Sequence, residues 1–111
     1  MKQFFTIVFS LITYGLFAQD VAFKKGNFKD DKSGFEKAKA NLDSGDEWLD
    51  KGKVKVLDMV YAANEYAKAL EFYLPAQDFN PNNADLNRKI GHAYLYTNAP
   101  YKAMTFLKKS L

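Results

Sequence analysis

The chain contains no cysteine and a single histidine, His92. Without cysteine it can form neither a disulfide framework nor a thiolate metal site. One histidine also cannot supply the paired or clustered histidines of the common nucleophile–base and zinc motifs. A glycine-rich phosphate loop is missing as well. The sequence therefore predicts no catalytic residues, no metal site and no cofactor.

The chain also has little net charge, because its 16 basic side chains are nearly balanced by 13 acidic ones, which gives a net charge of +3. So small an excess does not predict binding to nucleic acid or to an anionic membrane surface. Three carboxylates fall in a segment expected to be flexible or solvated: Asp30, Asp31 and Glu36. A second acidic group is interleaved with lysines, which favours a solvated helix face over a metal site: Asp43, Asp46, Glu47 and Asp50.

Long hydrophobic runs are absent except at the start, where residues 4–17 are mostly apolar. This run is shorter than the roughly 20 residues that a membrane-spanning helix needs. It follows Lys2 and ends with the small residues Gly15 and Ala18, as a secretory signal peptide does. A buried N-terminal helix and a membrane anchor are the alternatives. We expect residues 1–18 to be removed on export, so that the mature protein begins at Gln19. Because it has no cysteine at the cleavage point, it is not expected to carry a lipid anchor.

The remaining chain shows helical periodicity after a polar segment, 19–34, that we expect to be a flexible lead-in. Residues 35–51 carry apolar and small side chains three and four positions apart, which predicts an amphipathic helix ended by Gly52. The stripe consists of Phe35, Ala38, Leu42, Gly45, Trp48 and Leu49. Residues 53–64 are ambiguous, because "KVKV" alternates like a strand whereas "VLDMVYAA" suits the start of a helix.

Three further helices are expected, with Asn and Pro punctuating the chain between them. The first begins near Glu65, and Pro75 should loosen its last turn. The second spans 84–96, with Asn82 or Asn83 as its cap and Asp85 three residues after Asn82 as a capping partner. The third spans 100–111 and begins at a proline.

Equivalent residues in two of these helices are 34 positions apart, for example Ala69 and Ala103. The same offset relates Lys68 to Lys102 and Phe72 to Phe106, so the chain is similar to tetratricopeptide repeats. The resemblance implies an all-α solenoid of antiparallel helix pairs, with units at about 35–83 and 84–111. The first unit would contain about 12 extra residues between its helices, at 53–64.

A narrower resemblance is carried by "KALEFYLPAQDFNPNNADLNRKIGHAYLYT" and by the "FAQ" ending of the leader. It is to exported bacterial envelope proteins in which tetratricopeptide repeats precede a β-propeller and an OmpA-like peptidoglycan-binding domain, some of them associated with type IX secretion. This resemblance implies a non-catalytic scaffold in the periplasm or at the outer membrane, in only peripheral contact with the membrane. The alternative is a structural spacer or assembly piece of a larger protein of that kind.

A groove lined by the first helix of each unit follows from the same resemblance. In the second unit its positions would be Asp85, Arg88, His92, Leu95 and Tyr96. Such a mixture of charge and apolar floor suits an extended peptide or a partner helix. The alternative is that these side chains face solvent and bind nothing. The apolar end of the last helix is expected to dock on a further repeat, another domain or a second copy: Ala103, Met104, Phe106, Leu107 and Leu111.

Overall fold

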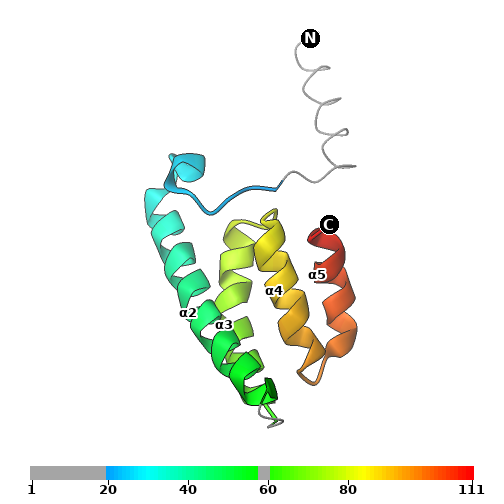
Figure 1. Cartoon of the computed structure of the whole chain (residues 1–111). Helices are drawn as coiled ribbons and strands as arrows, with labels where there is room; N and C mark the ends of the chain where they lie inside the picture. Colours follow the sequence, from blue (N-terminus) through cyan, green and yellow to red (C-terminus); the bar gives the residue numbers. More distant parts are fainter. Residues whose placement is uncertain (1–19, 58–60) are drawn as a thin grey trace.

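The computed structural model describes residues 20–57 and 61–111, and the predicted signal peptide lies outside these residues. Over the described part of the chain, only helices and connecting turns are found. The α-helices are α2 (Lys32–Leu57), α3 (Ala63–Phe79), α4 (Ala84–Leu95) and α5 (Ala103–Lys109). They lie side by side in chain order and alternate in direction (Figure 1). The predicted all-α fold class is therefore confirmed.

Helix α2 is longer than the sequence predicts at both ends. Asp31 accepts a hydrogen bond from the backbone N of Gly34 (2.9 Å), which satisfies a donor in the first turn. Gly52 does not end the helix, so this prediction is wrong. A Cβ placed on Gly52 would lie 3.1 Å from the ring of Tyr66, so the glycine allows a close approach between α2 and α3. The "KVKV" stretch accordingly continues α2 and is no strand.

The asparagine-rich turn before α4 provides one of the two expected caps. The side chain of Asn83 accepts a hydrogen bond from the backbone N of Leu86 (2.8 Å). Asp85 forms no capping pair with Asn82, because it binds Arg88 and Lys89 instead. Earlier in the chain, α3 includes Pro75 and continues to Phe79.

The last predicted helix, 100–111, is present in two parts. A 3₁₀-helix, η2 (Pro100–Lys102), leads directly into α5. Ala103 is buried, and the ring of Phe106 stacks on Tyr94 of α4 with 5.6 Å between centroids. A Cβ on Gly91 would lie 2.6 Å from the side chain of Leu107. Phe106 and Leu107 therefore face α4, and only part of the predicted apolar end is exposed.

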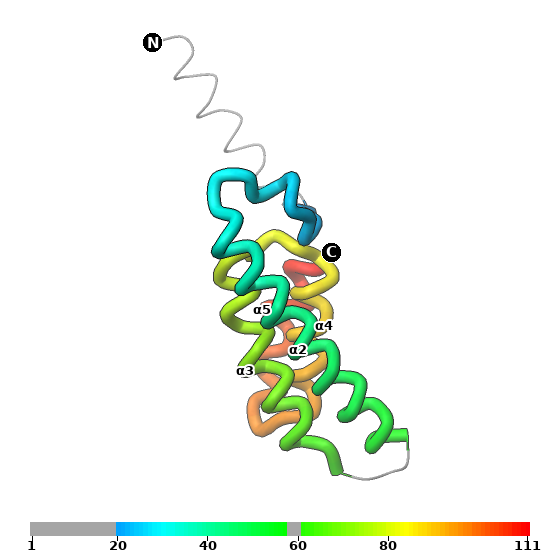
Figure 2. The backbone as a smooth tube through the Cα atoms, turned by 90° about the vertical axis from the view of Figure 1, so that its left-hand side faces the viewer, coloured from blue at the N-terminus to red at the C-terminus, as the bar shows by residue number. Residues whose placement is uncertain are grey.

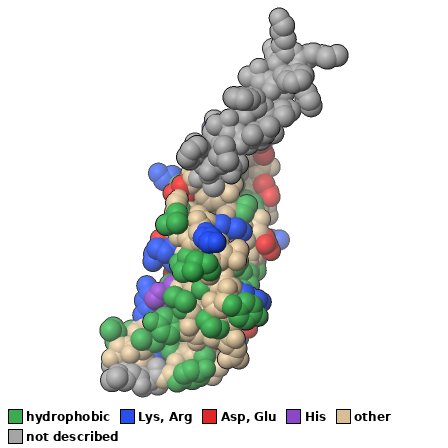
Figure 3. Space-filling view, turned by 90° about the vertical axis from the view of Figure 1, so that its right-hand side faces the viewer, with side chains coloured by type: hydrophobic (Ala, Val, Ile, Leu, Met, Phe, Trp, Pro, Cys, Tyr) green, Lys and Arg blue, Asp and Glu red, His purple; other side chains and the backbone are tan. Residues whose placement is uncertain are grey.

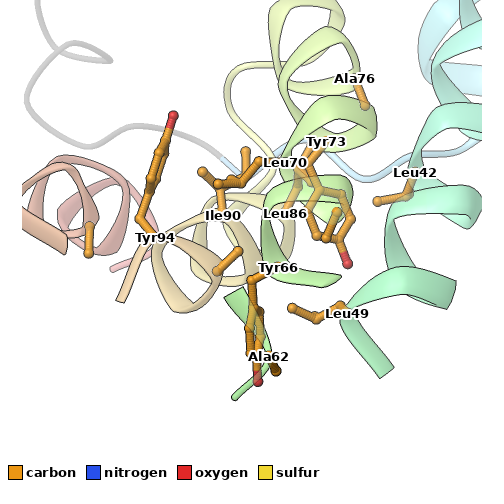
Figure 4. Packing of buried hydrophobic residues seen from close by; sticks show 13 residues of the cluster. Leu42, Leu49, Ala62, Tyr66, Leu70, Tyr73, Ala76, Leu86, Ile90 and Tyr94 are labelled. Carbon is orange, nitrogen blue, oxygen red and sulfur yellow. The ribbon is translucent and has the colours of Figure 1, made fainter. Parts of the chain in front are cut away.

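The core lies between the four helices and follows the predicted stripes. On α2, all members of the predicted stripe are buried except Trp48, which is partly buried. Tyr66 and Tyr73 of α3 and Leu86 and Ile90 of α4 are almost completely buried (Figure 4). These large side chains join the two helix pairs into one hydrophobic cluster.

The segment before α2 is fixed to the turn between α3 and α4. Val21 donates its backbone N–H to the carbonyl of Asn82 (2.9 Å), and its own carbonyl accepts from the side chains of Asn80 (2.8 Å) and Asn83 (2.9 Å). A short 3₁₀-helix, η1 (Lys25–Phe28), follows, and Phe28 contacts the ring of Phe79 of α3. Figure 2, viewed from the α2 side, shows this segment beside the N-terminal end of α2. The predicted lead-in thus connects α2 with the α3–α4 turn.

Candidate functional site

The sequence-predicted groove residues lie on α4 and at its C-terminal end, and α4 contacts α2, α3 and α5. On this side of the molecule, two groups of side chains come together, one polar and one aromatic. We call them the polar cluster and the aromatic hollow. The polar cluster consists of Asp46, Tyr73, Asp85, Arg88 and Lys89. The aromatic hollow is lined by Lys53, Val56, Leu57, Tyr66, His92 and Tyr96.

The polar cluster links three helices through Asp46 of α2. One oxygen of Asp46 accepts hydrogen bonds from the hydroxyl of Tyr73 (2.6 Å) and from Nζ of Lys89 (2.9 Å). Lys89 also pairs with Asp85 (3.1 Å), which in turn pairs with Arg88 (2.8 Å). Asp46 is therefore no member of a purely solvated helix face, because it holds α3 and α4 against α2.

The protonation states in this cluster follow from its packing. Burial and the hydrogen bond to Asp46 raise the pKa of Tyr73, so its hydroxyl stays protonated. Burial alone would lower the pKa of Lys89, but its hydrogen bonds to Asp46 and Asp85 raise it. Burial opposes the ionisation of Asp85, but Arg88 and Lys89 lower the pKa of its carboxyl. The charges are thus compensated within the cluster, and its main effect is to fix the helices relative to one another.

The aromatic hollow has a volume of about 250 Å³ and lies where the C-terminal ends of α2 and α4 meet the start of α3. Tyr66 forms its floor and is only 1 % exposed. The ring of Tyr96 stacks on that of Tyr66, with centroids 4.9 Å apart and planes inclined by 17°. Leu57 and Tyr96 are exposed at its edge. The hollow is therefore an open, mainly apolar site with an ordered aromatic floor.

His92 lies against both tyrosines of the hollow, with its ring centroid 5.6 Å from that of Tyr66 and 5.3 Å from that of Tyr96. Burial, together with the positive charges of Lys53 and Arg88, lowers the pKa of His92. The imidazole is thus neutral at pH 7, and its Nε2 lies 3.5 Å from the hydroxyl of Tyr66. Burial and the neighbouring Tyr96 raise the pKa of Tyr66, which keeps that hydroxyl neutral as well.

The five residues predicted to line a groove fall into three groups. His92 and Tyr96 both line the aromatic hollow. Asp85 and Arg88 pair with each other in the polar cluster. Leu95 is half exposed and lines neither of these sites.

The remaining walls of the hollow were not identified from the sequence. Lys53, Val56 and Leu57 fall in the stretch interpreted as an insertion, and Tyr66 was not assigned to the apolar face of its helix. A signal was present, because Gly52 and Val56 continue the helical spacing that begins at Leu49. Extending α2 by that spacing would have placed Val56 on the face that meets α3.

The site offers packing and hydrogen bonding. Within residues 20–57 and 61–111, no three His, Asp or Glu side chains converge where a metal ion could bind. A membrane span is likewise not found among the helices of the described residues. What the geometry supports is the binding of an apolar side chain on the tyrosine–histidine floor.

Comparisons with known proteins give no further assignment, since no family model, no curated protein and no solved structure matches this chain.

Proposed function

We propose that this chain is a non-catalytic protein-interaction module that binds a peptide or a partner protein in the aromatic hollow. The observation that carries the proposal is the open hollow in which exposed Tyr96 stacks on buried Tyr66 beside neutral His92, where three helix ends meet. Rigid aromatic side chains provide large contact areas at a low cost in conformational entropy. A volume of about 250 Å³ is enough for one aromatic or aliphatic side chain of a ligand.

We further propose that the helices form two tetratricopeptide-like units, α2–α3 and α4–α5. Two equivalent contacts support this. A Cβ on Gly45 of α2 would lie 2.5 Å from the ring of Tyr73, and a Cβ on Gly91 of α4 would lie 2.6 Å from Leu107. Tyr73 and Leu107 are 34 positions apart, which is the offset of the repeat. In both units a glycine of the first helix thus receives a large side chain of the second.

The proposed setting is the bacterial cell envelope, after export directed by residues 1–18. It rests on the leader and on the resemblance of 35–111 to envelope scaffolds. A role as a spacer or assembly piece is the second candidate. The compensated charges of Asp85 and Arg88 favour it, because these two predicted groove residues bind each other.

Selection of peptides from a random phage-displayed library on the full chain tests the proposed site. We expect the selected peptides to share an aromatic or aliphatic residue. Tyr96→Ala, alone or combined with Arg88→Ala, should weaken their binding by about tenfold or more, as loss of a central aromatic contact does. Val54→Ala removes an exposed apolar side chain of α2 that does not line the hollow and should leave the affinity unchanged.

Circular dichroism must show that the variants remain folded. Selected peptides that bind Tyr96→Ala as tightly as the original chain would refute the assignment of the hollow. A library that yields no peptide above the level of an unrelated helical protein would favour the spacer role.

A further inference from the structure

The 3₁₀-helix η2, helix α5 and the chain end after them present an exposed row of side chains, here called the α5 stripe. It consists of Tyr101, Met104, Lys108 and Leu111. Steps of three and four residues place these positions on one face of a helix. Tyr101, Met104 and Leu111 are 76 %, 59 % and 101 % exposed. Figure 3 shows hydrophobic side chains gathered on this side of the molecule.

Three of the four equivalent positions in the preceding unit are buried or partly buried, whereas Ala67 is exposed. They lie 34 residues earlier, on α3: Ala67, Leu70, Leu74 and Gln77. Leu70 is 6 % exposed and Gln77 is 8 % exposed, and Leu74 packs partly buried against the core. Figure 4 shows Leu70 beside Leu86 and Ile90 of α4. On α3, this face is largely buried against α4. The equivalent face of α5 is exposed.

The charged side chains of η2 and α5 are all basic, and Asp20 lies near the end of the stripe. The sequence after Asp85 contains no acidic residue and five basic ones. Arg88 and Lys89 already pair with Asp85 and Asp46. The other three are Lys102, Lys108 and Lys109, and no carboxylate of the described residues pairs with them.

We propose that the α5 stripe binds an acidic amphipathic helix of a partner protein, in the position that α4 takes on α3. Apolar residues at the spacing of Leu86, Ile90 and Ala93 would cover Met104 and Leu111. Carboxylates at the edge of that helix would face Lys108, which stands where α3 has Leu74. This surface is separate from the aromatic hollow and does not depend on it.

The positive charge of the stripe favours this partner over a second copy of the chain. Pairing two α5 helices would bring Lys108 and Lys109 of both copies together, and like charges in an interface oppose association. The stripe also ends at a second hollow of about 230 Å³, which extends the surface past the last turn of α5. That hollow is lined by Asp20, Pro81, Asn82, Ala84, Lys109 and Leu111.

Fluorescence anisotropy with a labelled synthetic helix tests the proposal on the full chain. The probe carries Leu, Ile and Ala at the spacing of Leu86, Ile90 and Ala93 and glutamate on its other faces. A scrambled peptide of the same composition has no apolar face and serves as the control. We expect the probe to bind, and Met104→Glu and Lys108→Glu each to weaken it by about tenfold or more. Raising the salt from about 0.05 M to about 0.5 M should weaken it further.

Val54→Glu places the same charge on an exposed apolar position of α2 and should leave probe binding unchanged. His92→Ala and Tyr96→Ala should also leave it unchanged, which separates this surface from the aromatic hollow. Equal binding of the scrambled peptide, or unaltered binding by Met104→Glu, would overturn the proposal. A dimer in sedimentation that Met104→Glu abolishes would also overturn the proposal. So would binding to phosphatidylglycerol vesicles that Met104→Glu abolishes, if the chain does not bind the probe.

Discussion

Gly45 of α2 lies directly under the ring of Tyr73 of α3, so that a Cβ on the glycine would be 2.5 Å from two ring carbons. Tyr73 has no exposed surface, and its hydroxyl donates a hydrogen bond to Asp46, the residue after Gly45. Burial and this hydrogen bond both restrict movement of the ring. The contact sets the distance between α2 and α3.

Gly45→Ala should destabilise the fold by about 1–3 kcal/mol, because the added methyl group overpacks this contact. Gly91→Ala should cost less, since the side chain that it meets, Leu107, is partly buried and can change rotamer. Denaturation by urea measures both. Gly26→Ala is the control, because nothing lies within 4 Å of a Cβ at that position. An unchanged free energy of unfolding in Gly45→Ala would contradict the close approach.

Ala69→Leu and Ala103→Leu test the proposed repeat at its small positions. Both alanines are at most 1 % exposed, so the larger side chain should overpack each helix pair and cost about 1–3 kcal/mol. For a domain of this size, the melting temperature should fall by roughly 4–8 °C per kcal/mol. Ala67→Leu, at an exposed position of α3, should have little effect. If both buried variants melt like the original chain, the alignment of the two units is wrong.

The helices of this chain could be predicted where the signal lies within the sequence of the helix itself. The apolar stripe of α2, the Asn83 cap and Pro100 at the start of η2 are local features of this kind. The offset of 34 can be read from the sequence because it compares side chains of the same type, and the repeat that it suggests stays a proposal. These features were enough for the all-α class and for most helix boundaries.

Features that depend on tertiary contacts could not be predicted in the same way. A glycine can end a helix or admit a neighbouring ring, and only the position of Tyr66 shows that Gly52 does the second. Asp46 is 27 residues from Tyr73 and 43 from Lys89, so no local pattern shows that it binds both. The hollow takes its walls from three helices, and its α2 wall follows the glycine that was interpreted as a stop.

Protein recovered from the cell envelope should begin at Gln19. The apolar run at 4–17, together with Gly15 and Ala18, predicts cleavage after Ala18. N-terminal sequencing of exported protein provides the measurement, and Ala18→Trp should block processing because the cleavage site requires a small residue. Recovery of envelope protein that still begins at Met1 would refute the predicted leader.

The polar cluster should make the fold sensitive to alkaline pH. The pKa of Tyr73 is raised above 10.0 in the folded state, so its contribution is complete below pH 10 and is lost as the pH rises beyond it. The raised pKa of Lys89 acts in the same direction above its ordinary value of 10.5. Urea denaturation at pH 8 and pH 11 should therefore show lower stability at the higher pH. Tyr73→Phe should reduce this dependence, whereas Tyr61→Phe, at an exposed position, should leave it unchanged.

His92 should titrate below its ordinary pKa of 6.5, because it is partly buried and faces the positive charges of Lys53 and Arg88. Its neighbour Tyr66 has a raised pKa and is uncharged near neutral pH. The folded state then binds fewer protons than the unfolded state as the pH falls through 6.5, so stability should decrease in that direction.

An NMR titration of the His92 ring protons measures this pKa directly. Lys53→Gln and Arg88→Gln should each raise it toward 6.5, because each removes one of the opposing charges. Lys37→Gln, an exposed change near the start of α2, should not move it. A midpoint at or above 6.5 in the original chain would mean that the imidazole is more open to water than its contacts with Tyr66 and Tyr96 imply. The tyrosine–histidine floor of the hollow would then lack the order that the proposed binding site requires.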